Sequence, residues 1–322
     1  MAGRGDSFTV LIPSFNDWDA LRLLLPRIDR AFADTGRTAS VLIVDDASTE
    51  ALPHEWPGQI YSAIRSVEIL HLRCNLGHQR AIALGLHHIH EFSDSEVVVV
   101  MDGDGEDRAE DLPAILDEFE RCGRHEVVFA ARTRRMESLA FQFFYRVYQV
   151  LHRVLTGVEV RVGNFSVLPR KALARVIASP DLWNNYSAAV IRARIPRRLL
   201  PLARGVRLSG VSKMNFVSLL MHGLSALAVF SDQVSARLLT ASAGLSVVAL
   251  AAILSGQLAR TTVGWLIVLM LQVLTFAILF AFLIARGRSS AGFVLQRDAP
   301  YFILGKRSVR SEAGAAERVE TR

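Results

Sequence analysis

Residues 97–113, VVVVMDGDGEDRAEDLP, carry four valines directly into a group of acidic side chains. An apolar run of β-branched residues followed by Gly and Asp is typical of a buried strand of a parallel sheet, here ending at Asp102. Parallel sheets bind ligands outside the carboxyl ends of their strands, where Asp102, Asp104 and Glu106 are expected to lie. Clustered carboxylates repel one another unless a cation neutralises them, and hard oxygen ligands suit Mg²⁺ or Mn²⁺. The alternative is a solvated acidic turn before a helix that begins near Glu110.

The first 131 residues alternate short apolar runs with helical stretches. The apolar runs FTVLIP, SVLIVDD, VEILHL, EVVVVMD and EVVFAA begin at residues 8, 40, 67, 96 and 126. This alternation predicts an α/β fold with a parallel-rich sheet wound by right-handed crossovers. Asp45 and Asp46 follow the second run as Asp102 follows the fourth, so both acidic groups are expected at the same carboxyl edge of the sheet.

The chain is more apolar than is usual for a soluble protein, and its longest uncharged stretches lie in the second half. Of the 322 residues, 51% are hydrophobic, and the mean hydropathy is +0.28. Residues 238–259 and 261–285 contain no charged side chain, and each stretch exceeds the roughly 20 residues that cross a bilayer. We therefore predict a transmembrane hairpin over residues 236–286. Its loop carries only Arg260, whereas eight Lys or Arg follow from Arg286 onward, so the positive-inside rule places both termini in the cytoplasm.

Charge and cysteine content restrict the compartment and the partners. The net charge of +6 is compatible with nucleic acid or with an anionic membrane surface, and the two apolar stretches favour the membrane, with no nucleic-acid partner expected. The first residues, MAGRGDSFTV, lack the apolar core of a signal peptide, so we expect the amino-terminal region to face the cytoplasm. Cys74 and Cys122 have no metal-type spacing and are expected as free thiols.

Two further segments are apolar and aromatic with interspersed basic residues. They are SLAFQFFYRVYQVLHRVL over residues 138–155 and MNFVSLLMHGLSALAVF from residue 214, which leads toward the first predicted span. Either one alone is compatible with a core helix. Because there are two, we predict helices that lie in the membrane interface.

Five short motifs carry a family resemblance. VLIPSFND, VLIVDDAST, LRCNLGHQRAIALGL, MDGDGED and RLSGVSKM occur in this order before the two predicted spans. In this the chain resembles family 2 glycosyltransferases, and more closely the polyprenyl-phosphate group that includes dolichol-phosphate mannose synthase and bacterial undecaprenyl-phosphate sugar transferases. The resemblance implies a GT-A-type nucleotide-sugar-binding domain. It also implies inverting, metal-dependent transfer of one sugar from a nucleotide-diphosphate sugar to polyprenyl phosphate, here undecaprenyl phosphate. The expected location is the cytoplasmic face of a bacterial inner membrane.

The implied organisation has four parts. Residues 1–213 form a cytoplasmic GT-A catalytic domain that includes the interfacial helix near 138–155, and residues 214–235 form an amphipathic juxtamembrane helix. The transmembrane hairpin spans 236–286, and a basic cytoplasmic tail spans 287–322. The exposed apolar hairpin and the resemblance together favour a homo-oligomer.

The resemblance also assigns the donor-side residues. Pro13, Phe15 and Asp17 line the nucleotide pocket, and Asp45 and Asp46 contact base and ribose; a turn in which Asp46 bonds Ser48 or Thr49 is the alternative. Residues matched to the phosphate-contacting segments and to the metal-binding DxD are Asn75, Gly77, Arg80, Arg207, Ser212, Lys213, Asp102 and Asp104. His78 and Gln79 are assigned no role. Scattered basic flanking charge is the alternative for the Arg207–Lys213 motif, although it leaves the RxxGxSK spacing unexplained.

The chain departs from the family pattern at three places. Glu106 replaces a common Gln, so it either binds the metal or reaches water. Arg132 and Arg146 are matched to the acceptor phosphate. Relatives usually carry further basic residues and a Ser early in the helix that contains Arg146, whereas this chain has LAFQFF there. Relatives commonly have an acid at or next to Gly163 or Asn164, and its absence suits a phosphate acceptor, which is already anionic and needs no general base.

Two other functions remain open at this point. A processive polysaccharide synthase is expected to carry a QxxRW signature and more spans, and this chain has neither. A non-catalytic membrane scaffold or lipid transporter is not expected to keep Asp102, Asp104, Arg207 and Lys213.

Overall fold

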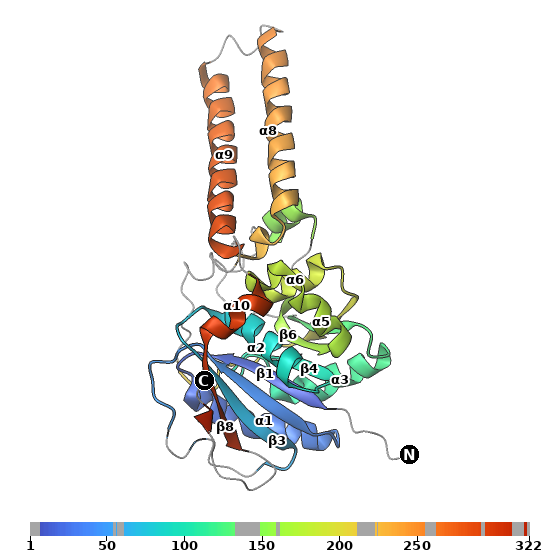
Figure 1. The fold of residues 1–322 in the computed structure, drawn as a ribbon. Helices are drawn as coiled ribbons and strands as arrows, with labels where there is room; N and C mark the ends of the chain where they lie inside the picture. Colours follow the sequence, from blue (N-terminus) through green and yellow to red (C-terminus); the bar gives the residue numbers. More distant parts are fainter. Residues whose placement is uncertain are drawn as a thin grey trace. The chain divides into compact units, whose positions relative to one another are not determined.

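The computed structural model describes residues 7–53, 56, 61–132, 149–158, 162–210, 223, 225–254, 262–290, 294–310 and 319–320 (Figure 1). The chain divides into two compact units. The first comprises residues 1–136, 161–214 and 292–322, and the second comprises residues 137–160 and 215–291. Residues 137–160 therefore group with the predicted hairpin, whereas the sequence-based prediction places the 138–155 helix in the catalytic domain.

The first unit is built on a mixed, parallel-rich sheet, as the sequence predicts. Its strand order is β7-β5-β6-β4-β1-β2-β3-β8-β9. The strands are β1 (Phe8–Ser14), β2 (Ala39–Asp45), β3 (Ile64–Leu72), β4 (Val97–Val100), β5 (Val127–Arg132), β6 (Val162–Pro169), β7 (Arg197–Leu202), β8 (Ile303–Arg310) and β9 (Val319–Glu320). β4 pairs parallel with β1, β1 with β2, and β2 with β3, and β5 pairs parallel with β7. β4 ends at Val100, two residues before the predicted end at Asp102.

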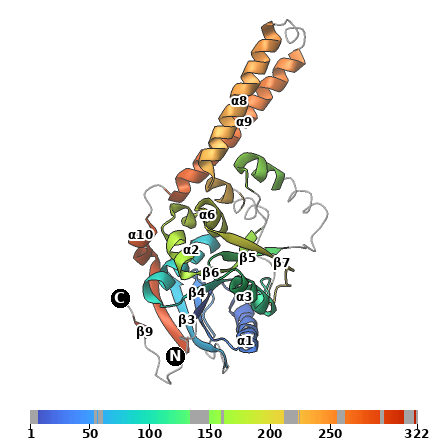
Figure 2. The same cartoon turned by 90° about the vertical axis from the view of Figure 1, so that its right-hand side faces the viewer.

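Strand periodicity divides the interior into two cores, one on each face of the sheet. Val10 and Ile12 of β1 face one core with helices α1 (Trp18–Asp34) and α3 (Leu112–Arg121). Leu11 faces the other core, because successive side chains of a strand point to opposite faces. The helices of that second layer are α2 (His78–Phe92), α5 (Arg170–Ile177), α6 (Tyr186–Arg192) and α10 (Leu295–Phe302), together with the 3₁₀ turn η2 (Pro180–Trp183). In Figure 2, α1 and α3 of the first layer and α2, α6 and α10 of the second layer are labelled.

An antiparallel strand interrupts the parallel order. β6 lies between β4 and β5 and pairs antiparallel with both. The sequence predicts β5 as the next strand of the parallel series and does not predict β6. Its polar residue Asn164 is thereby placed beside the end of β4, where the acidic stretch begins.

The segment after the predicted hairpin belongs to the first unit. The sequence predicts a basic tail over residues 287–322, whereas residues 295–310 form α10 and β8. β8 pairs antiparallel with β3, and Leu295 and Ala299 of α10 are buried against the α2 side of the sheet.

The 3₁₀ turn η1 (Ala109–Asp111) and α3 occupy the place where the sequence predicts a helix from about Glu110.

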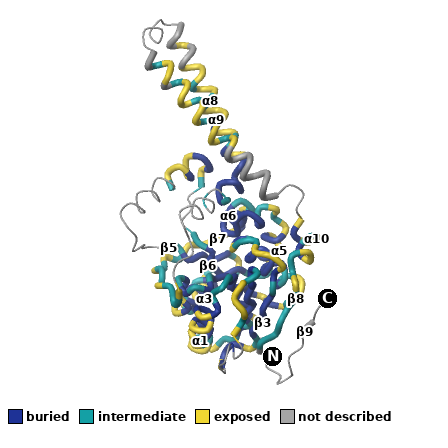
Figure 3. The backbone as a smooth tube through the Cα atoms, turned by 90° about the vertical axis from the view of Figure 1, so that its left-hand side faces the viewer, coloured by how far each residue is buried: buried dark blue, intermediate teal, exposed yellow. Residues whose placement is uncertain are grey.

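The second unit contains two long helices, α8 (Ser231–Leu254) and α9 (Thr262–Ser290). Many of their described residues have apolar and exposed side chains. Figure 3 colours much of the tube of α8 and α9 yellow, the colour of exposed residues. The side chain of Gln272 in α9 accepts a hydrogen bond from Ser242 Oγ at 2.6 Å and donates to Ser246 Oγ at 2.8 Å, so it links the two helices. Within the described residues, no helix meets the combined length and hydropathy that a membrane span requires. The transmembrane part of the prediction is therefore unconfirmed.

Candidate functional site

The acidic groups of β2 and β4 end at the same edge of the sheet. β1 lies between these strands and pairs parallel with both, with Ser14 opposite Asp45 and Leu11 opposite Val100. Asp45 ends β2, and Asp102 lies two residues past β4. The sheet thus brings the two acidic groups to one carboxyl edge, as the sequence predicts.

Asp45 organises the turn after β2. Its carboxylate accepts a hydrogen bond from the Ser48 N–H at 2.9 Å and lies 2.9 Å from His71 Nδ1 on β3. Burial alone raises the pKa of Asp45, but the hydrogen bonds from His71 and Ser48 outweigh it and lower the pKa below its ordinary value. Asp45 is therefore held ionised. The sequence-based alternative expects a turn in which Asp46 bonds Ser48 or Thr49. In the structure Asp45, not Asp46, accepts the hydrogen bond from Ser48.

Asp46 holds the loop that precedes α2. Its two carboxylate oxygens accept from the backbone N–H groups of Leu76 at 2.7 Å and Gly77 at 2.8 Å. The Asn75 side chain donates to the Asp46 carbonyl at 3.2 Å. Burial raises the pKa of Asp46 more than these backbone hydrogen bonds lower it. Asn75 and Gly77, both predicted site residues, are thus tied to the end of β2.

Asn16 connects the loop after β1 with the loop after β2. It has a positive φ of 52°, and its side-chain oxygen accepts from the N–H groups of Thr49 at 2.8 Å and Glu50 at 3.0 Å. The predicted residues Pro13, Phe15 and Asp17 flank it in the sequence. The loop that carries Asp17 is therefore fixed against the loop that follows Asp46.

Arg207 lies between two carboxylates from distant parts of the chain. Its Nη2 atom donates to Asp17 Oδ1 at 2.5 Å, and its Nη1 atom donates to Asp104 Oδ2 at 3.1 Å. Its Nε atom donates to the Ser209 carbonyl at 2.8 Å. Hydrogen bonds between ionised partners are roughly twice as strong as neutral ones. Three predicted site residues, Asp17, Asp104 and Arg207, are thus brought together.

Residues 204–208 form a strap along the loop that contains Asp104. The N–H of Leu208 donates to the Asp104 carbonyl at 2.9 Å, and the N–H of Gly205 donates to the Glu106 carbonyl at 2.8 Å. The Glu106 carboxylate pairs with Arg204. The close approach requires glycine at residue 105, because its φ is +85° and an added Cβ overlaps the Leu208 side chain.

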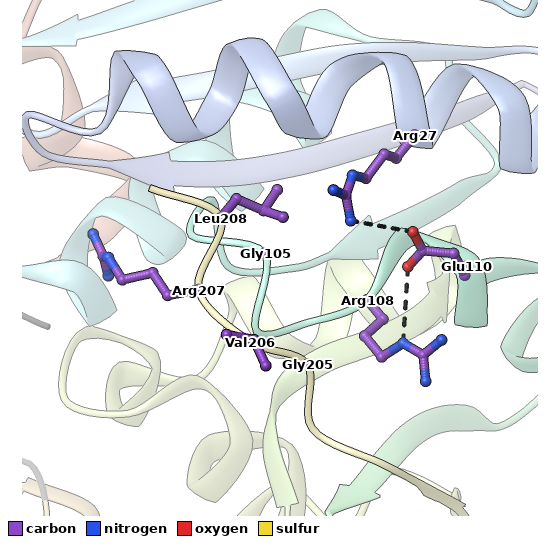
Figure 4. Close-up of a pocket in the computed structure, with 8 residues that line it drawn as sticks. All are labelled: Arg27, Gly105, Arg108, Glu110, Gly205, Val206, Arg207 and Leu208. Carbon is purple, nitrogen blue, oxygen red and sulfur yellow. Dashed lines mark hydrogen bonds and ion pairs between the residues drawn. The ribbon is translucent and has the colours of Figure 1, made fainter. Parts of the chain in front are cut away.

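A pocket of about 420 Å³ adjoins this strap. In Figure 4, Arg27 and Arg108 face Glu110, at 3.4 Å and 3.8 Å between charged atoms, while Arg207 points away from them. Both arginines share the single carboxylate of Glu110, so this side of the pocket keeps a net positive charge. Arg207 is instead directed toward Asp17 and Asp104.

Asp102 lies among polar side chains from two other elements. Asn164 Nδ2 donates to Asp102 Oδ1 at 3.2 Å, and His78 Nε2 lies 3.1 Å from the same oxygen. Burial lowers the pKa of His78, but the negative charge of Asp102 outweighs it and raises the pKa above its ordinary value. The Asp102 backbone N–H donates to Asp107 at 2.9 Å, which closes the acidic loop on itself.

The residues fit a hard divalent cation at Asp102 and Asp104. Both carboxylates lie on one short loop and offer the hard oxygen ligands that such a cation prefers, and in this structure Arg207 and Arg204 supply positive charge to the acidic group. Among the residues whose structure is described, no three His, Cys, Asp or Glu side chains come together as a metal-binding group. Glu106 pairs with Arg204 and Asp104 pairs with Arg207, so a cation at either carboxylate would replace an arginine contact. The metal roles of Asp102, Asp104 and Glu106 stay predictions.

Several predicted residues lie outside this geometry. Arg146, Ser212 and Lys213 lie outside the described residues, as does the side chain of Arg132, whose backbone ends β5. The guanidinium of Arg80 lies over the Trp183 ring, 5.2 Å from its centroid. A phosphate contact by Arg80 stays a prediction.

Comparison with known proteins identifies the family. The family model described as "Glycosyl transferase family 2" matches residues 9–177, more than half of the chain and the segment that supplies β1 to β6. The chain belongs to glycosyl transferase family 2. The match includes Asp17, Asp45, Asp46, Asp102 and Asp104, so the carboxylates at the sheet edge lie within the family domain.

Individual relatives and solved structures agree with this family. The undecaprenyl-phosphate 4-deoxy-4-formamido-L-arabinose transferase of Klebsiella pneumoniae is 24% identical over 223 residues, which cover 66% of this chain and 64% of that protein. The chain thus matches just under two thirds of the length of that relative. An uncharacterised glycosyltransferase of Synechocystis is 23% identical over 227 residues and 69% of each chain.

Among solved structures, mannosyl-3-phosphoglycerate synthase from Rubrobacter xylanophilus has a TM-score of 0.52 at 14% identity, covering 72% of this chain and 75% of that one. Glucosyl-3-phosphoglycerate synthase from Mycobacterium tuberculosis, solved with Mn²⁺, UDP-glucose and phosphoglyceric acid, has a TM-score of 0.50 at 13% identity, covering 72% and 80%. These likenesses show a GT-A-like α/β fold for this family 2 chain.

Four residues of the site have no role in the sequence-based prediction: Asn16, His78, Gln79 and Asn164. Asn16 lies inside the PSFND motif, and His78 and Gln79 directly follow Gly77, so adjacency to motif residues is a usable signal. Asn164 is a buried polar residue in the mostly apolar strand β6, and a buried amide usually requires a hydrogen-bond partner.

Proposed function

We propose that this family 2 chain transfers one sugar from a nucleotide-diphosphate sugar to a polyprenyl phosphate, with inversion and with a divalent cation. The observation that carries the proposal is the convergence of Asp17, Asp104 and Arg207 at the carboxyl edge of the sheet. A nucleotide diphosphate needs both a cation held by carboxylates and a basic side chain for its phosphates. This edge offers the carboxylates of Asp17 and Asp104 and the guanidinium of Arg207 in one hydrogen-bonded group.

The donor would bind across the ends of β1, β2 and β4. Pro13, Phe15, Asp17 and Asp45 would surround the nucleoside, and Asp46 would hold the Asn75–Gly77 loop against it through the backbone hydrogen bonds described above. Arg207, with Lys213 and Ser212 from the same motif, would contact the diphosphate. An Arg matches phosphate oxygens with its planar fork, whereas a Lys adds a point charge.

Asp102 and Asp104 would hold the cation, Mg²⁺ or Mn²⁺. When bound, a divalent cation neutralises the negative charge that develops on the diphosphate as its bond to the sugar breaks. The Mycobacterium tuberculosis structure with Mn²⁺ and UDP-glucose supports this choice of cation class. Arg207 would then exchange its contact with Asp104 for the phosphates.

A lipid phosphate suits the residues around Asp102. A hydroxyl acceptor needs a base, and at the β6 position where relatives commonly have an acid this chain places the neutral amide of Asn164 beside Asp102. A phosphate acceptor is already ionised. The name of the Klebsiella pneumoniae relative, undecaprenyl-phosphate 4-deoxy-4-formamido-L-arabinose transferase, supports the same acceptor class.

We expect Arg132→Ala to raise the acceptor KM by about tenfold and to leave the donor KM unchanged, because one charged hydrogen bond to phosphate contributes about 1.5 kcal/mol or more. Initial rates with undecaprenyl phosphate and a panel of radiolabelled nucleotide sugars measure both constants. Arg198→Ala, which removes a surface arginine paired with Glu118 and Glu126, is the control. Equal transfer to a free polyprenol, or an unchanged acceptor KM, would contradict the assignment.

The membrane part of the proposal is a hairpin at residues 236–286 of a bacterial inner-membrane protein. The uncharged stretches 238–259 and 261–285 support it, as do exposed apolar side chains of α9 such as Leu266, Met270 and Phe276. The chain re-enters the first unit as α10 and β8, so the segments before and after the hairpin join one folded unit. A hairpin satisfies this requirement, because it returns the chain to the side from which it started.

Cysteine labelling of intact cells tests this topology. In a background with Cys74 and Cys122 replaced by serine, a membrane-impermeant thiol reagent is expected to label Gln257→Cys or Thr261→Cys but not Ser7→Cys or Ser311→Cys. The reason is the charge asymmetry between the loop and the tail. Labelling in permeabilised cells shows that all four thiols can react. External labelling at Ser7→Cys would overturn the orientation.

A further inference from the structure

A chain of side-chain amides connects the backbone of α6 with Asp102. The Tyr186 N–H donates to Gln79 Oε1 at 2.8 Å, Gln79 Nε2 donates to Asn164 Oδ1 at 3.1 Å, and Asn164 Nδ2 donates to Asp102 Oδ1 at 3.2 Å. Gln79 and Asn164 are 9% and 8% exposed, so water competes little for these bonds. The links come from α6, α2, β6 and the loop after β4.

The backbone at one end determines the direction of every bond. A backbone N–H only donates, so Gln79 has to turn its carbonyl oxygen toward Tyr186 and its amide nitrogen toward Asn164. Asn164 then has to offer its oxygen to Gln79 and its nitrogen to Asp102. A carboxylate oxygen only accepts from a neutral amide, so the last bond has the polarity that the first one imposes.

The anchored end of this amide chain is rigid. The Tyr186 side chain is fully buried, and its hydroxyl lies 2.7 Å from Ser166 Oγ. Ser166 Oγ in turn donates to the Asn164 carbonyl at 2.9 Å. The backbone and the side chain of Asn164 are therefore both held by the packing between β6 and α6.

We propose that Gln79 and Asn164 are positioning residues that fix the rotation of the Asp102 carboxylate, and with it the direction in which Asp102 meets a divalent cation. The inference rests on the proposed metal role of Asp102. His78 Nε2 lies 2.8 Å from Asn164 Nδ2 and 3.1 Å from Asp102 Oδ1, so the imidazole packs against the Asn164–Asp102 hydrogen bond. Hydrogen-bond partners that orient metal ligands typically change metal affinity 10- to 100-fold when they are removed.

Gln79→Glu tests the polarity directly. At about pH 8.5 the carboxylate that this substitution introduces is ionised and has only acceptors, so Asn164 has to turn its amide nitrogen toward it and its oxygen toward Asp102. We expect the affinity for Mn²⁺ alone, measured by electron paramagnetic resonance on the full chain, to fall by about tenfold or more. The sign is diagnostic, because an added negative charge near a cation site strengthens cation binding by itself.

Two variants serve as controls. Asn185→Asp adds a negative charge near the same α6 anchor, but its side-chain oxygen can still accept from the Ala188 N–H, so Mn²⁺ binding is expected to be unchanged or tighter. Gln79→Met removes the amide without adding charge and is expected to weaken Mn²⁺ binding several-fold. Because the Tyr186 N–H and the Asn164 amide oxygen lose their partner, we expect a lower melting temperature in a chain that still folds. This variant keeps the test decisive if Gln79→Glu does not fold.

The outcomes separate this inference from the proposed function. If the wild-type chain binds no Mn²⁺, or if Asp102→Asn binds it as well as wild type does, the metal role is wrong and this inference falls with it. If Asp102→Asn loses Mn²⁺ while Gln79→Glu and Gln79→Met bind it normally, only the positioning role is overturned. Loss of Mn²⁺ in both Gln79 variants, with normal binding by Asn185→Asp, supports the positioning role.

Discussion

Asp104→Asn is expected to lower kcat for sugar transfer by about a hundredfold or more while the melting temperature stays near that of the wild-type protein. Asp104 lies on the acidic loop, accepts the Glu106 N–H at 2.9 Å and contacts Arg207. An asparagine keeps the size of the side chain and an oxygen acceptor for that N–H but removes the negative charge. Loss of one well-placed electrostatic stabiliser typically costs about 3 kcal/mol in the transition state, roughly a hundredfold in rate. Initial rates at saturating donor and acceptor measure the change.

Glu110→Gln is the matched control for Asp104→Asn. Glu110 follows on the same segment, but it is half-exposed and pairs with Arg27 and Arg108. Its kcat is expected to equal that of the wild type. Treatment with EDTA should reproduce the Asp104→Asn defect in the wild-type protein, and excess Mn²⁺ or Mg²⁺ should reverse it. Near wild-type turnover by Asp104→Asn would exclude the metal role of this residue.

Arg207→Ala is expected to lower kcat/KM for the nucleotide sugar by about a hundredfold. Asp17 and the Ser209 carbonyl hold the guanidinium in place when its contact with Asp104 is exchanged for phosphate, so little rotamer freedom is lost. A hydrogen bond to a charged group is worth about 1.5–3 kcal/mol, and Arg207 can form two. Because a competing cation is removed, binding of Mn²⁺ alone should be at least as tight as in wild type.

Two comparisons define the specificity of the Arg207→Ala effect. Arg207→Lys keeps the charge but loses the planar fork, and an intermediate donor kcat/KM is expected. The acceptor KM should remain unchanged in both variants, in contrast to Arg132→Ala. A donor kcat/KM close to wild type in Arg207→Ala would assign the arginine a purely structural role in holding the strap.

Local periodicity predicts the first half of the fold well. The five apolar runs appear as β1 to β5, and the amphipathic stretches between them appear as α1, α2 and α3. Buried parallel strands and amphipathic helices leave strong local patterns, since each must present an apolar face to one core. The placement of Asp45 and Asp102 at one edge is also predictable from the sequence, because both come directly after parallel strands.

The remaining features depend on contacts between distant residues. Arg207 and Asp17 are 190 positions apart, and no local pattern specifies that one guanidinium joins Asp17 to Asp104. β6 inserts antiparallel between β4 and β5, so the neighbour of Asp102 is Asn164 from a strand that the alternation does not predict. The amide orientation follows from the Tyr186 backbone, which only the packed structure brings to Gln79.

The pairing of β8 with β3 also determines the order in which the protein can assemble. Lys306 of β8 pairs with Glu68 of β3, a separation of 238 positions, and the whole α8–α9 segment lies between them in the sequence. During synthesis, β3 must wait with one unpaired edge until α9 has left the ribosome. An unpaired strand edge is a template for association with other chains. We therefore expect a nascent chain that ends before residue 303 to be the stage most vulnerable to aggregation.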